Sequence, residues 1–446
     1  MSEKDVSSLK VNQDRLIGDI HHTCQWGTGE RWGTASTETG MSRLSLSDAD
    51  KEARDWFVAT TKDLGCKTTV DAMGNIFAVR PGLNNNVPPT FAGSHLDTQP
   101  TGGRYDGILG VTAAVEMLKV LNENWVETEY PVGVVNWTNE EGARFPISMV
   151  SSGVWAGAIA QDHAHNLVEV GGGTATMKSE LERIAYLGSV PASHASTPMA
   201  AHFELHIEQG PILEAENRKI GIVKGVQAYR WFTITVRGGD CHTGTTDFKN
   251  RADALLAASK MILQSHRAAT KAKALASTGI LTLRPGSTNT VPGTVRFSLD
   301  IRAAKDETVE ALEEQLKRDF AAIAAGEDVG NLNEGGTPGK RCEVEWRTDS
   351  VSEAINFHED CISCVTESAR GIFGDRAEDL TKSMISGAGH DSVYTSKRVP
   401  TSMIFVPSKD GVSHNPVEYT SPEDCALGAQ VLLGAVLRYD RMRAAR

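Results

Sequence analysis

Five polar segments of this chain carry the residue types that metal-assisted hydrolysis needs. They are centred on His95, Asp106, the pair Glu140 and Glu141, His206 and His414. Several of them come at or just beyond the end of a short apolar run, as the glutamate pair does after Val134–Thr138. Because ligands bind beyond the carboxyl ends of the strands in open α/β sheets, we expect these side chains to converge at one sheet edge.

The donor atoms in these segments are imidazole nitrogens and carboxylate oxygens. Such a set suits Zn²⁺ and, by the same ligand chemistry, Mn²⁺, Co²⁺ or Ni²⁺. Two ions about 3.5–4 Å apart can share one carboxylate and one water. Asp106 stands alone between glycine-flanked turns and is the natural bridge. Asp97, two residues after His95, is expected to fix the tautomer of that imidazole.

The adjacent glutamates cannot point the same way, so one can ligate a metal while the other transfers protons. We assign Glu141 as the ligand and Glu140 as the general base, although the residues alone allow either order. Each segment also has a simpler interpretation. A single histidine at a strand end is usually structural, an Asp-Gly pair is usually a turn, and paired glutamates usually face solvent. The residues alone support a metal hydrolase and a structural set about equally.

Strands and helices alternate from Thr90 onward, which predicts a mixed, mostly parallel sheet flanked by helices. A helix is expected over Ser47–Leu64, with Ser45 or Ser47 as its N-cap. Gly27–Gly29 is expected to be a loop, because its glycines lack the spacing of a dinucleotide-binding motif. The other expected elements are Phe91–Ser94, Gly107–Leu121, Val132–Thr138, Met149–Ala158, Phe203–Ile207, Phe357–Phe373, Thr401–Val406 and Pro422–Arg438.

Residues 227–347 have a pattern of their own. The expected elements follow the order β-α-β-β-α-β, at Trp231–Val236, Arg251–Ala269, Thr278–Leu283, Val295–Ile301, Glu307–Ala324 and Cys342–Trp346. This is the ferredoxin-like order. We therefore expect a compact module inserted into a catalytic domain made of residues 1–226 and 348–446.

The composition argues against several classes of protein. The 446 residues carry a formal net charge of −12, which disfavours a nucleic-acid or anionic-membrane partner. No apolar run reaches membrane-spanning length, and Met1–Lys10 lacks the apolar region of a secretory signal. The seven cysteines are scattered and odd in number, which favours a reducing, cytoplasmic setting. Cys361 and Cys364 form a CxxC pair that we expect to pack within a helix.

Six ordered motifs cover the chain from about Gly40 onward: Gly93–Thr98, Tyr105–Gly107, Asn139–Phe145, His206–Pro211, Gly387–Asp391 and Ser413–Asn415. Together they resemble the hydantoinase/carbamoylase family of metal-dependent amidases, a branch of the zinc aminopeptidase-like metallohydrolases. The resemblance implies that His95, Asp106 and His206 hold one metal ion. It implies that Asp106, Glu141 and His414 hold the other, and that Glu140 is the general base.

Four further positions match substrate contacts of that family. By this resemblance, Gln209 would contact a carbamoyl group, and His242 would stabilise the oxyanion from the partner subunit of a homodimer. Asn289 and Arg302 would bind the substrate carboxylate. Without the resemblance, His242 and Arg302 would be interpreted as surface residues. The inserted module would be the family's lid and dimerisation domain.

The family includes N-carbamoyl-L-amino-acid hydrolases, β-ureidopropionases and allantoate amidohydrolases. Thr98–Pro100 and Trp26–Trp32 look most like fungal-type β-ureidopropionases, which makes N-carbamoyl-β-alanine the first candidate substrate. N-carbamoyl-L-α-amino acids and allantoate are the alternatives. A peptidase of the wider superfamily is less well supported, because such enzymes usually carry a carboxylate where this chain has His206. An inactive binding protein is disfavoured because all five ligands and the base are present.

Overall fold

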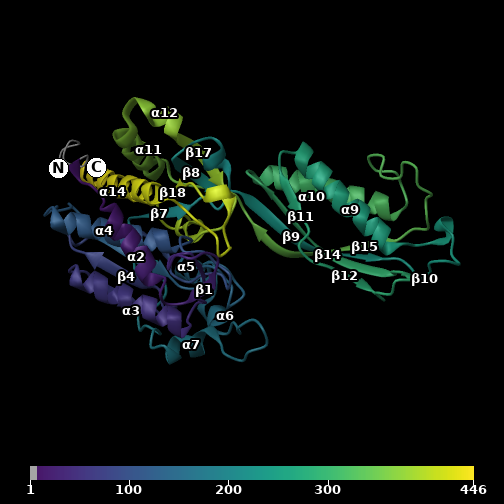
Figure 1. Ribbon diagram of the computed structural model, residues 1–446, viewed down its shortest axis with the longest axis horizontal. Coiled ribbons are helices and arrows are strands. Elements are labelled where there is room, and N and C mark those ends of the chain that lie inside the picture. Colours follow the sequence, from purple (N-terminus) through teal and green to yellow (C-terminus); the bar gives the residue numbers. More distant parts are fainter. Residues whose placement is uncertain (1–7) are drawn as a thin grey trace. The chain divides into compact units, whose positions relative to one another are not determined.

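The structure is a computed structural model that describes residues 8–446, so the expectation for Met1–Lys10 falls largely outside it. The chain forms two compact units (Figure 1). The first contains the residues up to Gly225 together with Asn356–Arg446, and the second contains Val226–Ile355. Among residues 8–446, no helix is long and apolar enough to cross a membrane.

The first unit is built on a nine-stranded sheet of order β16-β8-β18-β7-β5-β6-β4-β3, with β17 paired to β8. Its central strands are parallel to one another: β18 (Thr401–Val406), β7 (Ala201–Ile207), β5 (Thr90–His95) and β6 (Val132–Trp137). They are buried along their full length, as expected for strands covered on both faces. The outer strands are β3 (Lys67–Val70), β4 (Ile76–Arg80), β8 (Ile220–Val226), β16 (Ile355–Asn356) and β17 (Thr381–Ser386). The predicted mixed, mostly parallel sheet is confirmed.

Helices flank this sheet, and local sequence sets where they begin. Ser47 accepts a hydrogen bond from the Asp50 amide and caps α3 (Asp48–Asp63), as predicted. Cys361 and Cys364 are both buried in α11 (Glu359–Phe373), so the CxxC pair does pack within a helix. The remaining helices are α2 (Gln13–Thr23), α4 (Ile108–Glu123), α5 (Val150–Trp155), α6 (Gln161–His165), α7 (Met177–Arg183), α8 (Ile212–Ala215), α12 (Ala377–Leu380), α13 (Ser392–Thr395) and α14 (Pro422–Ala444).

The segment near Gly27 and the strand β8 are places where the first unit differs from the sequence expectation. The segment around Gly27–Gly29 is not a loop, because Thr28–Arg31 forms β1, paired antiparallel with β2 (Thr39–Met41). Gly29 permits this close pairing, since a Cβ atom there would lie 2.8 Å from the Met41 backbone. The β8 strand was not predicted, because two glycines interrupt its apolar pattern.

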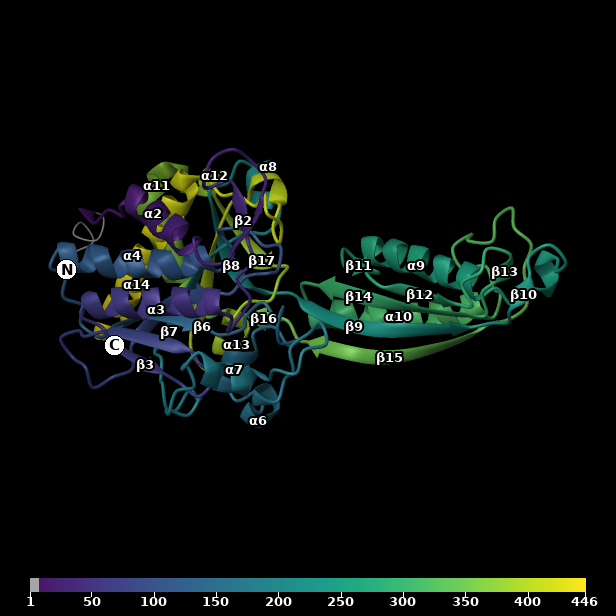
Figure 2. The ribbon, with the colours of Figure 1, turned by 60° about the horizontal axis from the view of Figure 1, so that its bottom comes forward.

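The second unit is an antiparallel sheet of order β11-β14-β9-β15, with β12 also paired to β14 (Figure 2). Its strands are β9 (Ala228–Arg237), β11 (Leu275–Ser277), β12 (Leu281–Arg284), β14 (Thr294–Ala303) and β15 (Glu343–Ser352). The crossing elements are α9 (Ala254–Lys271) and α10 (Asp306–Ala324). A separate ribbon joins β10 (Cys241–His242) to β13 (Thr290–Val291). The order of the main elements is the expected ferredoxin-like one.

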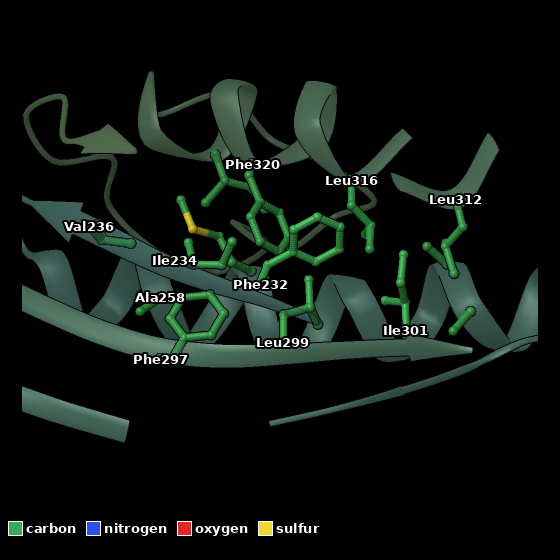
Figure 3. Packing of buried hydrophobic residues seen from close by; sticks show 14 of the residues in the cluster. Phe232, Ile234, Val236, Ala258, Phe297, Leu299, Ile301, Leu312, Leu316 and Phe320 are labelled. Atoms are coloured by element: carbon green, nitrogen blue, oxygen red, sulfur yellow. The ribbon is translucent and has the colours of Figure 1, made fainter. Parts of the chain in front are cut away.

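Alternate residues of β9 and β14 form the core of this unit. Phe232 and Phe297 pack with Phe320 of α10 between the sheet and the helices (Figure 3). Because one face of each strand is buried, the register of the sheet is strongly specified. The unit also extends past the expected boundary at residue 347, since β15 pairs with β9 as far as Ser352. It ends at Ile355.

Candidate metal centre

The sheet of the first unit brings the five predicted ligands together. His95 is the last residue of β5, His206 lies near the end of β7, and Glu141 follows β6. Asp106 precedes α4, and His414 lies in the loop after β18. Because β5, β6, β7 and β18 are adjacent and parallel, their carboxyl ends meet at one edge, as the sequence predicted.

The ligand atoms form two groups that share one residue. In the first group, Asp106 Oδ1 lies 3.0 Å from His206 Nε2 and 3.6 Å from His95 Nε2. In the second group, His414 Nε2 lies 3.3 Å from Asp106 Oδ2 and 3.5 Å from Glu141 Oε2. The atoms of each group lie within 4.8 Å of one another, close enough to hold a metal ion. The two oxygens of Asp106 therefore face different groups.

The histidine tautomers suit a metal. His95 Nδ1 lies 2.9 Å from the Asp97 carbonyl oxygen, and His206 Nδ1 lies 2.9 Å from the Ile207 carbonyl oxygen. A carbonyl accepts only, so each Nδ1 carries the proton and each Nε2 presents a lone pair to Asp106. Within residues 8–446, His95 Nε2 is buried with no hydrogen-bond partner. A buried, unpaired nitrogen lone pair facing carboxylates fits a cation ligand.

The electrostatics of the site also favour a cation. Burial raises the pKa of Glu141 to about 7, and the neighbouring Asp106 adds to the effect. Burial alone would raise the pKa of Asp106, but the neighbouring His206, His414 and His95 outweigh burial and lower this pKa well below the usual range. Hydrogen bonding to Asp106 raises the pKa of His414 to about 9. The crowded carboxylates repel one another, and the positive charge of divalent ions would stabilise them in their ionised form.

Asp97 acts differently from the sequence expectation. The backbone carbonyl of Asp97, not its carboxylate, faces His95 Nδ1. The carboxylate instead accepts hydrogen bonds from the backbone amides of Glu140 and Glu141, each at 3.3 Å. Asp97 therefore holds the turn that carries both glutamates.

Glu140 lies beside the first group of ligands. Its Oε2 lies 3.6 Å from His95 Nε2, and the side chain is almost fully buried. Burial raises the pKa of Glu140 well above its usual range, and Asp391 and Glu141 raise it further while His95 opposes them. A carboxyl group with a high proton affinity, beside the ligands but outside both groups, has the placement that a general base needs.

Gln209 reaches the shared ligand directly. Its Nε2 donates to Asp106 Oδ2 at 2.8 Å and lies 3.3 Å from His414 Nε2. Gln209 and His414 both have positive φ angles, 59° and 53°, which non-glycine residues rarely adopt. Both residues therefore hold a strained backbone beside Asp106.

The three other predicted contacts lie in the second unit. His242 is opposite Thr290 in the β10–β13 ribbon, and the Thr243 amide donates to the Asn289 carbonyl at 2.9 Å, so His242 and Asn289 are neighbours. Arg302 lies near the other end of β14, where it pairs with Asp300 at 2.8 Å. The structure thus brings two of these residues together and separates the third from them.

His390 is a site residue to which the sequence assigned no role, although it belongs to the Gly387–Asp391 motif. Its ring lies 4.5 Å from that of His206, and with Glu204 the two histidines form a third group of potential ligands. His206 cannot serve both groups, because its Nδ1 faces a carbonyl and its Nε2 faces Asp106. Burial lowers the pKa of His390 to about 3, so His390 is a neutral ring packed behind the first group.

Comparisons with known proteins identify the family of this chain. The family model described as Peptidase family M20/M25/M40 matches residues 91–438. An N-carbamoyl-L-amino-acid amidohydrolase of Rhizobium meliloti is 36% identical over 433 residues, covering 96% of each chain. An allantoate amidohydrolase of Bacillus subtilis is 31% identical over 404 residues, covering 89% of this chain and 92% of its own.

Solved structures extend the similarity to the whole fold. The crystal structure of a hydantoinase/carbamoylase family amidase from Burkholderia multivorans matches with a TM-score of 0.85 and 40% identity, over 97% of this chain and 98% of that one. The chain therefore belongs to Peptidase family M20/M25/M40 and, within it, to the hydantoinase/carbamoylase branch. It is an amidohydrolase that acts on C–N bonds other than peptide bonds.

Proposed function

We propose that this protein is a two-metal amidohydrolase that removes the carbamoyl group from a small N-carbamoyl amino acid. The observation that carries the proposal is Asp106, whose two oxygens face two separate groups of metal-ligand atoms. Zn²⁺ suits these nitrogen and oxygen donors, and Mn²⁺, Co²⁺ and Ni²⁺ are compatible with them. The relatives named as N-carbamoyl-L-amino-acid and allantoate amidohydrolases support the same reaction class.

In the proposed mechanism the residues of the chain bind and orient the substrate and transfer protons. Bound divalent ions would lower the pKa of the attacking water and polarise the carbamoyl carbonyl. Glu140 accepts a proton from that water while the water oxygen bonds to the carbonyl carbon. Gln209 orients the carbamoyl group. Glu140 then gives the proton to the departing nitrogen as the C–N bond breaks. The products are a free amino acid and carbamate, which decomposes to carbon dioxide and ammonia.

The second unit would supply the remaining contacts, and its geometry supports a homodimer. The β10–β13 ribbon extends from the Thr294 end of β14, where Gly238 bonds to Gly293. Arg302 lies eight positions further along that strand, about 26 Å away at ~3.3 Å per residue. One small substrate cannot span this distance. If Arg302 binds the carboxylate, Asn289 and His242 must come from a second copy, with His242 stabilising the oxyanion.

The surface of the second unit offers a place for that copy. Leu256 and Leu263, one heptad apart on α9, are 47% and 44% exposed, and Leu281 on the outer strand β12 is 44% exposed. Exposed leucines beside a strand at the edge of a sheet mark an association surface. We therefore include a homodimer built through the second unit in the proposal.

The proposal also places the reaction in a reducing compartment. All seven cysteines of the described chain have free thiols, and most of them are buried, which favours a reducing compartment such as the cytoplasm. The net charge of −12 favours a small substrate held by local cations such as Arg302 over a nucleic-acid or membrane partner.

Ammonia release from a panel of N-carbamoyl compounds tests the reaction. We expect activity with N-carbamoyl-β-alanine or N-carbamoyl-L-α-amino acids, complete loss of activity after chelation, and recovery when Zn²⁺, Mn²⁺, Co²⁺ or Ni²⁺ is added back. Allantoate is the third substrate, and a dipeptide, followed by release of its amino acids, is the control. Turnover of the dipeptide without turnover of any carbamoyl compound would contradict the proposal, as would full activity in the presence of chelator.

Mixing two inactive variants tests the contribution of the second copy. Dimers of Glu140→Gln and of His242→Ala are each expected to be inactive. After subunit exchange, half of the dimers are mixed and each of those holds one intact site, so about one quarter of wild-type activity should return. Mixing Glu140→Gln with Glu141→Gln, both in the first unit, is the control and should restore none. Mass spectrometry shows whether mixed dimers have formed; mixed dimers without activity would mean that His242 acts within its own chain.

A further inference from the structure

A buried glutamate that no motif singled out lies between two of the loops that carry ligands. Glu418, 3% exposed, follows His414 by four residues. Its Oε1 accepts hydrogen bonds from the backbone amides of Tyr105 at 3.0 Å and Asp106 at 3.1 Å. Its Oε2 accepts a hydrogen bond from the Ser413 hydroxyl at 2.8 Å. One carboxylate thus connects the backbone of the shared ligand to the residue before His414.

The contacts around Ser413 complete this link. The Ser413 oxygen lies 3.3 Å from Asp106 Oδ2, and Gln209 Nε2 lies 3.2 Å from the same serine oxygen. Glu418 therefore holds Asp106 from its backbone side, while Ser413 and Gln209 hold it from the carboxylate side. The side chain of His414 itself is half exposed. It depends on its loop for position more than His95 and His206 do, since those two residues lie in buried strands.

The fit around Glu418 is close. A Cβ atom at Gly103 would lie 2.3 Å from both Cβ and Oε1 of Glu418, so only glycine leaves room for this carboxylate. The same glycine begins the turn that leads to Asp106. The position of the turn and the position of Glu418 are therefore coupled through direct contact.

We propose that Glu418 is a positioning residue that holds Asp106 and His414 at the correct separation to bind a metal ion together with Glu141. This inference rests on the proposed two-metal site. Glu418 does not touch the reacting atoms; it acts through the Asp106 backbone and the Ser413 hydroxyl. Its loss would therefore weaken the group formed by Asp106, Glu141 and His414 more than the group fixed in β5 and β7.

Zn²⁺ binding to the apo-protein, measured by competition with a chromophoric chelator, tests the inference. We expect Glu418→Ala to weaken binding of the ion held by Asp106, Glu141 and His414 by about 10- to 100-fold, the usual effect of removing a partner of a metal ligand. Binding of the other ion should change less. Glu418→Gln should recover most of the affinity, because an amide oxygen still accepts from both backbone amides and its NH₂ group can bond to Ser413. Visible spectra of the Co²⁺-substituted protein should change in Glu418→Ala and return toward wild type in Glu418→Gln.

Two further variants separate positioning from general stability. Gly103→Ala, which displaces the intact Glu418, should reproduce the Glu418→Ala binding defect. The matched control is Glu116→Gln, a fully buried glutamate on α4 that accepts from the Asn12 amide and pairs with Arg15. It should lower thermal stability without changing metal affinity. Equal affinity of wild type and Glu418→Ala for both ions would overturn the inference and leave the proposed function intact. A wild-type protein that binds fewer than two ions would instead contradict the proposed function.

Discussion

Glu140→Gln is expected to lower kcat by about 10²- to 10⁴-fold while both metal ions remain bound. Glutamine keeps the size and the backbone contacts of the side chain but cannot accept the proton from the attacking water. Glu140 lies outside both groups of ligand atoms, so its charge is not needed to hold either ion. Steady-state kinetics with the best carbamoyl substrate and metal analysis of the same sample measure the two effects together.

The neighbouring glutamate provides a matched control. Glu141→Gln alters a residue that lies 3.5 Å from His414 and is held by Gln99 at 2.8 Å, so it should lose metal as well as activity. The two variants therefore have opposite signatures in metal content. Near wild-type turnover in Glu140→Gln, or loss of metal from it, would show that the roles of the glutamates have been assigned wrongly.

Asp106→Asn is expected to have the largest effect on metal binding. Asp106 is the residue common to both groups that would each hold one ion, and asparagine offers only one oxygen and no charge. The affinity for each ion should fall by about 10²-fold or more, which would leave no measurable carbamoyl hydrolysis. Metal content after desalting and ammonia release are the measurements.

Asp71 serves as the control for this variant. It is also fully buried, but it accepts hydrogen bonds from Met73 and Asn75 in the turn between β3 and β4. Asp71→Asn should reduce the free energy of unfolding by about 1–3 kcal/mol and leave the metal content unchanged. If Asp106→Asn kept both ions, the shared-ligand interpretation would be wrong.

The five metal-ligand candidates were predictable because their positions follow from local rules. His95 ends a buried apolar strand, and Glu141 and His414 follow such strands, which end at a common edge in a parallel sheet. The split between Glu140 and Glu141 was not predictable from the residues, since neighbouring side chains diverge in a direction that only the turn decides. The family resemblance resolved it, and the orientation of Glu140 toward His95 agrees.

The contacts between loops could not be predicted. Glu418 accepts hydrogen bonds from the backbone amides of Tyr105 and Asp106, which lie more than 300 residues away in the sequence. No local sequence pattern links the two segments. From the sequence, the Asp97 carboxylate could equally reach the His95 ring or the loop after β6. In the structure it accepts hydrogen bonds from the loop amides. The end of the second unit was placed too early for a similar reason. The polar residues that continue β15 to Ser352 are recognisable as a strand only through their pairing with β9.

Anomalous diffraction from crystals of the Zn²⁺-loaded protein shows directly whether Asp106 is shared between two metal ions. We expect two peaks of zinc density about 3.5–4 Å apart, one on each side of the Asp106 carboxylate. His95 and His206 should contact one peak, and Glu141 and His414 the other. A single peak at Asp106, or a peak among Glu204, His206 and His390 instead, would contradict the two-metal site.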